Sequence, residues 1–213
     1  MSVTVTFDES FRKQFVELLA LRRDVRNFKS DPIPDGVVTE LVSLTRTSPS
    51  VGYSQPWRFV RVDSAKRRAA VIASFERANA DALASYEGER ATSYARLKLA
   101  GLHEAPVHLA VFCDDATETG KGLGAKTMPE TLAYSTTMAI YTLWLAARAR
   151  GIGVGWVSIL YPQEIERALD VPDGWRFIAY LCLGYPASYE KTPELLRAGW
   201  EKFDERSTHL TIR

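Results

Sequence analysis

Apolar residues recur with helical spacing in several stretches of this chain. Each stretch begins at a residue that suits a helix N-terminus, either an aspartate that can cap the first turn or a proline with a fixed φ. The spacing therefore predicts helices that end at polar, glycine-containing or proline-containing breaks. They run from Asp8 into the arginines at 22–26, from Asp35 to before Ser48, from Asp63 to about Leu102 with a break at Glu87-Gly88, from Pro129 to Arg150 with Gly151 as C-cap, and from Pro162 to Leu169.

Short apolar runs between these helices predict β-strands. No repeat or low-complexity linker divides the chain, so we predict one domain over residues 1–213. Strands that alternate with several helices indicate a mixed α+β class. The expected strands cover Phe59–Val62, Pro106–Cys113, part of Gly151–Leu160, Trp175–Leu183 and a brief segment at Leu210–Ile212.

The helix expected over 129–150 is apolar on nearly all sides, because Leu132, Met138, Ile140 and Trp144 do not share one face. Its uncharged run is shorter than the roughly 20 residues that a membrane-spanning helix needs. A helix without a polar face belongs in the core, in a subunit interface, or in both. We expect both.

Composition limits the possible partners. The chain has 213 residues, 46% of them hydrophobic and 25% charged, as in ordinary globular proteins. A net charge of +1 provides no broad basic surface, so neither nucleic acid nor a membrane is expected as a partner. The N-terminus MSVTVTFDES lacks the basic and apolar segments of a secretion signal, which predicts a cytoplasmic protein.

Cysteine and histidine positions argue against a metal centre. Cys113 and Cys182 lie in separate apolar runs and form no C-x-x-C pair, so we expect buried free thiols. The three histidines are scattered without metal-ligand spacing, and no metal is expected. His108 lies in a strand-like run and is expected to be packed or hydrogen-bonded.

The segment LRRDVRNF at 21–28 holds three arginines within five residues, with Asp24 among them. Guanidinium groups suit phosphate recognition, and neighbouring cations repel one another unless an anion lies between them. A charge run is equally typical of a solvated helix end, where cations offset the helix dipole. Both interpretations are open at this stage.

A glycine-rich stretch, GKGLGAKT at 120–127, resembles a phosphate-binding P-loop. Ala125 replaces the second glycine, and Asp114, Asp115 and Glu118 separate the stretch from the preceding strand. A P-loop follows its strand directly and begins a helix. We therefore expect a loop and not a nucleotide triphosphatase.

Three stretches together suggest a cofactor. The arginines supply phosphate donors, the loop SPSVGYSQPW at 48–57 supplies hydroxyl and amide groups with an aromatic wall, and 151–158 supplies three glycines that let a flat group approach the backbone. The combination suits a flavin or another nucleotide cofactor. The glycines could equally serve tight packing, and Ser50 could cap a turn.

Six stretches match one known family in detail: RRDVRNF (22–28), PSVGYSQPWRF (49–59), RLKLAGLHEAP (96–106), TMPETLAYSTTMAIYTLWLAARARGIGVGWVSIL (127–160), LCLGYP (181–186) and PELLRAGWE (193–201). The sequence resembles the nitroreductase-like flavoproteins, and within them the branch that consumes its flavin. Generic members usually carry a serine at the position of Asp24. The tail departs from the pattern, because 202–204 reads KFD where basic residues are expected, which argues against a cofactor role for the tail.

The resemblance implies an α+β fold with a central, mostly antiparallel sheet flanked by helices, in an intertwined homodimer that binds FMN at the subunit interface. Reduced FMN would be the substrate, supplied by a separate flavin reductase. Oxygen reacts with the reduced ring, the ring fragments, and the ribityl C1′ enters 5,6-dimethylbenzimidazole, the lower ligand of vitamin B12.

The resemblance also implies roles for particular residues. Arginines would bind phosphate and neighbouring groups, while other residues contact the flavin and two of them are essential to fragmentation. In this chain the phosphate-binding residues are Arg22, Arg23 and Arg26, the flavin contacts are Asp24, Val25, Ser50, Leu99 and Ser158, and the essential residues are Asp24 and Ser158.

A physical argument supports those last two roles independently. Arginines favour the charged form of a carboxylate between them, so Asp24 can take a proton or orient an oxygen species. Ser158, on a strand that leaves a glycine turn, can donate a hydrogen bond to the ring. The alternative for Asp24 is a purely structural ion pair.

Three functions remain open: fragmentation of reduced FMN, an FMN-dependent reductase that oxidises NAD(P)H, and a non-catalytic FMN carrier. A reductase needs room for a second substrate on the flavin, whereas a flavin-consuming enzyme should enclose it. Residues 70–102 are long enough to form the necessary lid, and 187–213 form a C-terminal extension.

Overall fold

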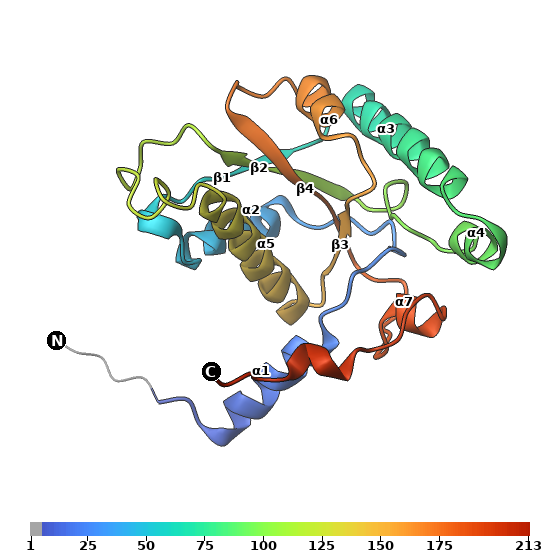
Figure 1. The fold of residues 1–213 in the computed structure, drawn as a ribbon, viewed down its shortest axis with the longest axis horizontal. Coiled ribbons are helices and arrows are strands. Elements are labelled where there is room, and N and C mark those ends of the chain that lie inside the picture. Colours follow the sequence, from blue (N-terminus) through green and yellow to red (C-terminus); the bar gives the residue numbers. More distant parts are fainter. Residues whose placement is uncertain (1–5) are drawn as a thin grey trace.

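The computed structural model describes residues 6–213. Its strands form one antiparallel sheet of four strands in the order β1-β2-β4-β3, so β3 lies at an edge (Figure 1). The predicted α+β class is confirmed. The strands are β1 (Trp57–Arg61), β2 (Val107–Asp114), β3 (Gly153–Val157) and β4 (Trp175–Gly184).

Helices cover both faces of the sheet. On one face lie α2 and α5, and on the other lie α3 and α6 (Figure 1). No helix within residues 6–213 has the length and apolar character needed to cross a membrane. The helices are α1 (Glu9–Leu21), α2 (Asp35–Leu44), α3 (Ala65–Ala84), α4 (Gly88–Ala95), α5 (Thr131–Ala149), α6 (Pro162–Leu169) and α7 (Glu194–Arg197), with short 3-10 turns at Thr45–Thr47, Val51–Tyr53 and Glu205–Thr208.

The central strands are apolar at almost every position because both of their faces are covered. Leu109 and Leu181, which pair across β2 and β4, pack on the α2–α5 side. Ala110 and Tyr180 pair next to them and pack on the α3–α6 side. Successive side chains of a strand point to opposite faces, so two separate cores share one sheet.

Two predicted helix starts are wrong by one or two residues. Ser64, not Asp63, is the N-cap of α3, and its hydroxyl accepts a hydrogen bond from the Arg67 amide. Pro129 lies in a turn that is closed by a bond from the Leu132 amide to the Pro129 carbonyl, and regular α5 geometry begins at Thr131. A tightened first turn of this kind shifts a helix boundary without changing the packed face.

Two further predictions for irregular segments are wrong. The helix expected over 90–102 covers only α4, and residues 96–105 leave it as an irregular chain. The strand expected at 210–212 is an exposed coil. It pairs with no strand of the described sheet, and Leu210 is 89% exposed, so local β-propensity alone does not produce a strand.

Both cysteines are buried and free, as predicted. Burial raises the pKa of the Cys113 thiol and of the Cys182 thiol to about 12. A thiol with so high a pKa is not a nucleophile near neutral pH. Neither cysteine is therefore a candidate for catalysis.

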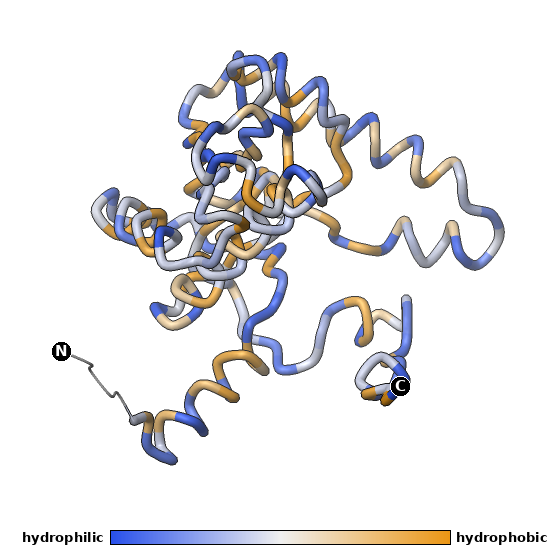
Figure 2. Tube along the Cα trace, turned by 60° about the vertical axis from the view of Figure 1, so that its left-hand side comes forward, coloured by the Kyte–Doolittle hydropathy of each residue, from blue (hydrophilic) through white to orange (hydrophobic). Residues whose placement is uncertain are grey.

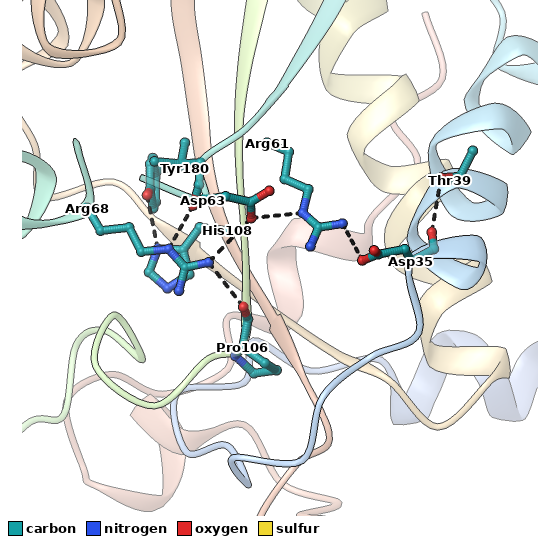
Figure 3. A network of polar contacts seen from close by, with 9 residues as sticks. Asp35, Thr39, Arg61, Asp63, Arg68, Pro106, His108 and Tyr180 are labelled. Carbon is teal, nitrogen blue, oxygen red and sulfur yellow. Dashed lines mark hydrogen bonds and ion pairs between the residues drawn. The ribbon is translucent and has the colours of Figure 1, made fainter. Parts of the chain in front are cut away.

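His108 forms a buried polar pair with Tyr180 inside the α3–α6 core (Figure 3). Its Nδ1 lies 2.9 Å from the Tyr180 hydroxyl, and the residue is 1% exposed. The prediction of a packed or hydrogen-bonded histidine is confirmed. Burial, and then the nearby charge of Arg68, lower the pKa of His108 from 6.5 to about 4.

This pair predicts a loss of stability in acid. The unfolded chain takes up a proton at His108 near pH 6.5, whereas the folded chain does so only near pH 4, so acidification through this window favours unfolding. We expect His108 to contribute a loss of about 3 kcal/mol in the free energy of unfolding between these limits.

Urea unfolding of the native protein and of His108→Gln at a series of pH values measures this contribution. Glutamine can still hydrogen-bond the Tyr180 hydroxyl but does not titrate, so its curve should fall less steeply with acid. The exposed His103→Gln variant is the control. Equal slopes for the native protein and His108→Gln would contradict the prediction.

Candidate functional site

Residues 22–28, called the arginine segment below, lie along the free edge of β3. The Val25 amide donates to the Val154 carbonyl at 3.0 Å, and Asp24 and Val154 form a parallel bridge. The Asp24 Oδ1 atom accepts a hydrogen bond from the Trp156 amide at 2.8 Å. The Asp24 carboxylate oxygen thus accepts the hydrogen bond that the carbonyl of a neighbouring strand would otherwise accept. The arginine segment extends the sheet beside β3 only by the bridge between Asp24 and Val154.

The segment is fixed beyond this pairing as well. The Lys29 amide donates to Tyr185, the Ala187 amide donates to Asn27, and Phe28 is buried with 6% exposure. The arginine segment therefore follows α1 as an ordered, half-buried chain. This contradicts the interpretation of a solvated basic patch at a helix end.

The glycines after α5 serve tight packing. Gly151 has a φ of +72° and ends α5. A Cβ atom at Gly155 would lie 2.1 Å from the Val25 carbonyl oxygen, and one at Gly153 would lie 2.8 Å from the Val25 Cγ2 atom. Val25 thus fills the space beside Gly153 and Gly155, which favours the tight-packing alternative for these glycines.

The three guanidinium groups have different surroundings. Arg26 donates to Asp24 Oδ2 at 2.9 Å and to the Lys98 carbonyl at 3.0 Å, and its side chain is 12% exposed. Arg23 donates to the carbonyl oxygens of Lys191 and Arg22. Only Arg26 of the three is ion-paired with a carboxylate in the described part of the chain.

Arg22 and Arg23 therefore present two uncompensated charges side by side. The Arg22 guanidinium lies over the Trp144 ring, 5.0 Å from its centroid, and its buried Nε has no hydrogen-bond partner among residues 6–213. Burial, and then the charge of Arg22, lower the pKa of Arg23. Two close cations with a spare buried donor suit an anion such as phosphate.

A cavity of about 230 Å³ lies beside the arginine segment. Its walls come from Arg23–Asn27, from Ile152–Val154, and from the C-terminal residues 186–197. Ligand pockets usually measure about 300–1,000 Å³, so one copy of the chain encloses only part of a mononucleotide. The sequence does not predict that residues 186–197 line this cavity. Arg23 bonds a backbone carbonyl there, and a backbone carbonyl leaves no mark in the sequence.

Ser50 lies in a separate, strained loop. Its hydroxyl accepts from the Gln55 amide at 3.1 Å, and Tyr53 and Gln55 both have positive φ angles. The loop is fixed to α5 by a bond from the Val51 amide to Ser135. Nine residues further along α5, Trp144 donates to the Arg23 carbonyl, so about 13 Å of helix separates this loop from the arginine segment.

Ser158 and Leu99 are each close in sequence to a residue that hydrogen-bonds the arginine segment. Ser158 is exposed and follows the end of β3, two residues after the amide that bonds Asp24. Leu99 is half-buried and follows Lys98, whose carbonyl bonds Arg26. The structure therefore gathers the predicted residues 22–26 and places Ser158 and Leu99 next to their partners, whereas Ser50 is linked to them only through α5.

Two other sequence signals do not contribute to this site. Residues 120–127 form a series of turns that packs against Gly52, and the next helix begins four residues later, so the geometry of a P-loop is absent there. Among residues 6–213, no group of three or more histidine, cysteine, aspartate or glutamate side chains is arranged to hold a metal ion.

Comparisons with known proteins identify the family. The profile of the Nitroreductase family matches residues 19–185. The 5,6-dimethylbenzimidazole synthases of Rhodospirillum rubrum and Rhodobacter capsulatus are 56% and 48% identical to this chain, over 97% of this chain and 97% of the first, and over 93% of this chain and 96% of the second. The crystal structure of oxidized iodotyrosine deiodinase bound to FMN and 3-iodo-L-tyrosine has the same fold, with a TM-score of 0.71 and 22% identity over 93% of this chain and 97% of that one. The chain belongs to the nitroreductase family.

Proposed function

We propose that the protein is a 5,6-dimethylbenzimidazole synthase that fragments reduced FMN in the presence of oxygen and so supplies the lower ligand of vitamin B12. Relatives with this activity in their names match the chain almost end to end. The observation that carries the proposal is the Asp24 carboxylate, held between the Trp156 amide and Arg26 beside two uncompensated arginines.

The residues of the site fit FMN. The spare donors of Arg22 and Arg23 suit its phosphate, and the ring would lie along the arginine segment near Asp24 and Val25. Leu99 would pack over the ring, and Ser50 would contact it from the strained loop. When bound, reduced FMN supplies the electrons and the carbon skeleton of the product.

Asp24 and Ser158 have distinct roles in this proposal. The two bonds to Asp24 fix the direction of its carboxylate, and each oxygen retains lone pairs for a proton or a ligand donor. Its side chain is 31% exposed, so a ligand can reach it. Ser158 leaves β3 with an exposed side chain and would donate a hydrogen bond to the ring. Asp24 would act as proton acceptor during fragmentation.

Residues 70–102, which include most of the α3–α4 hairpin (residues 65–95), would form the lid. The carbonyl of Lys98 in this region already bonds Arg26, which supports closure over the arginine segment. An enclosed flavin favours fragmentation over a reductase reaction, because a reductase must admit a nicotinamide. Reduced FMN would come from a separate flavin reductase.

A second copy of the chain would complete the site. Helix α1 extends from the body and has no buried residue, although Phe11 and Phe15 are apolar (Figure 2). On α5, Tyr134, Met138 and Tyr141 remain 58%, 49% and 43% exposed on one helical face. Apolar surfaces of this size on two helices favour a homodimer in which these faces are buried.

The role of Asp24 predicts that Asp24→Asn binds FMN but forms at least about 100-fold less product. Asparagine retains one acceptor oxygen, so either the Trp156 amide or Arg26 loses its partner, and no group remains to take the proton. The assay is incubation with chemically reduced FMN in air, with chromatography for 5,6-dimethylbenzimidazole. Asp31→Asn, at an exposed position near the segment, is the matched control.

The results of this assay distinguish the proposed function from a reductase and test the role of Asp24. Product from the native protein, none from Asp24→Asn and normal product from Asp31→Asn support the proposal. Quantitative recovery of intact oxidised FMN from the native protein, with rapid NAD(P)H oxidation, would instead identify a reductase. Full product formation by Asp24→Asn would show that Asp24 is only a structural ion pair.

A site shared between two copies predicts complementation in mixed dimers. An Arg22→Ala/Arg23→Ala copy and a Ser50→Leu copy are each expected to be inactive as homodimers. In a random mixture of the two variants, about half of the dimers are heterodimers. If the arginines of one copy and the Ser50 loop of the other form one site, each heterodimer holds one intact site out of two. The mixture should then show about a quarter of the native activity. Co-expression with two different tags makes this measurable. Inactive heterodimers, purified through both tags, would place the whole site within one copy.

A further inference from the structure

Three aromatic rings from two distant parts of the chain meet at the α3–α4 hairpin. The Trp200 ring lies 5.6 Å from that of Tyr86 and 6.0 Å from that of Tyr94 between centroids, both edge to face. The Arg90 guanidinium lies 5.7 Å from the Trp200 centroid. Tyr94 is only 6% exposed although α4 is a short surface helix, and its contacts with Tyr86, Trp200 and Asn79 explain this burial.

The backbone of the C-terminal segment directs Trp200 to this position. Helix α7 ends at Arg197, and Gly199 adopts a φ of +70°. The Gly199 amide bonds the Leu196 carbonyl at 3.1 Å, and the Trp200 amide bonds the Leu195 carbonyl at 2.9 Å. This pair of bonds is the Schellman motif, which turns the chain sharply and fixes the residue that follows the glycine.

Both ends of this arrangement reach the arginine segment. Residues 187–200, called the strap below, begin beside the cavity, where the Lys191 carbonyl accepts two bonds from Arg23. The strap includes α7, which lies on the same side of the molecule as α4 (Figure 1). It ends at Trp200, whose ring contacts Tyr86 and Tyr94 of the hairpin. The hairpin in turn leads to Lys98, whose carbonyl accepts from Arg26. Arg23, the strap, the hairpin and Arg26 therefore form a closed circuit of contacts around the candidate site.

We propose that Trp200 is a positioning residue that holds the α3–α4 hairpin closed against the arginine segment while reduced FMN reacts. The inference rests on the proposed function. Trp200 acts through the hairpin, which keeps the Lys98 carbonyl on Arg26 and Leu99 beside the flavin. Aromatic pairs and a cation–π contact are strong enough to bias the position of a surface element without fixing it permanently.

Loss of this contact changes the fate of the flavin. With the hairpin open, bound reduced FMN is exposed to water and to free oxygen. Its two electrons and two hydrogens then pass to O2, which gives intact oxidised FMN and hydrogen peroxide in place of 5,6-dimethylbenzimidazole. The hairpin contact should therefore control the ratio of these two outcomes more than it controls the stability of the domain.

The test uses the full-length protein with Trp200→Ala, Trp200→Phe and, as matched control, Phe203→Ala, which removes a 67% exposed aromatic three residues further on. We expect Trp200→Ala to raise the ratio of oxidised FMN and peroxide to 5,6-dimethylbenzimidazole roughly ten-fold, because two ring pairs and a cation–π contact are lost. Trp200→Phe should restore most of the native ratio, and Phe203→Ala should match the native protein. Trp200→Leu, which keeps an apolar side chain without a ring, replaces Trp200→Ala if that variant does not fold.

Amide hydrogen exchange in flavin-free protein gives a readout that is independent of activity. Residues 86–97 should exchange faster in Trp200→Ala than in the native protein, while β2 and β4 stay unchanged. A native product ratio in Trp200→Ala, or unchanged exchange at 86–97, overturns the proposal, as does faster exchange spread evenly over the sheet. Absence of 5,6-dimethylbenzimidazole from the native protein refutes the proposed function instead, and the exchange result then still decides whether Trp200 holds the hairpin.

Discussion

The hydrogen bond from the Trp156 amide to the Asp24 carboxylate is the interaction on which the rest of the site depends. It occupies a free amide at the sheet edge, where an unpaired group would otherwise need water or another chain. The second oxygen of the same carboxylate holds Arg26, and Arg26 holds the Lys98 carbonyl. One side chain thus connects the sheet, the arginine segment and, through Arg26, the irregular chain that follows α4.

Asp24 bonds both the edge amide of Trp156 and the guanidinium of Arg26, and a serine at this position could not replace both bonds. A serine hydroxyl at this position could accept from the edge amide but would bring no charge to Arg26. An aspartate satisfies both partners and still presents an acceptor to a ligand. The residue that anchors the segment is therefore also the residue proposed to act on the flavin, and we propose that the strap and hairpin keep its surroundings closed.

The sequence predicted the fold class well because burial on both faces leaves a strong signal. The apolar runs of β2 and β4 follow directly from their central positions, and the apolar residues Ile140, Leu143 and Ala147 of α5 from its packing on one face of the sheet. The predicted start of α5 at Pro129 was wrong because a tightened turn decides where the regular helix begins. The predicted strand at 210–212 was wrong because a strand also needs a partner strand to pair with. Local preference does not contain that information.

The sequence predicted the parts of the candidate site that depend on side chains. It did not predict the parts that depend on backbone groups. Charge pattern and family resemblance pointed to the arginines and Asp24, and the structure brings these together. The carbonyl groups of Lys98 and Lys191 have no sequence signature, and neither does the entry of Val25 into the space left by Gly153 and Gly155. These contacts join segments more than 70 residues apart, so only the folded chain defines them.

We propose that this protein consumes the flavin that its arginine segment binds. The most direct measurement is a single turnover with reduced FMN that carries carbon-13 at the ribityl C1′, followed by mass spectrometry of the products. We predict 5,6-dimethylbenzimidazole one mass unit heavier than the unlabelled compound, with an equal loss of FMN. Labelled FMN recovered intact, with no labelled benzimidazole, would contradict it.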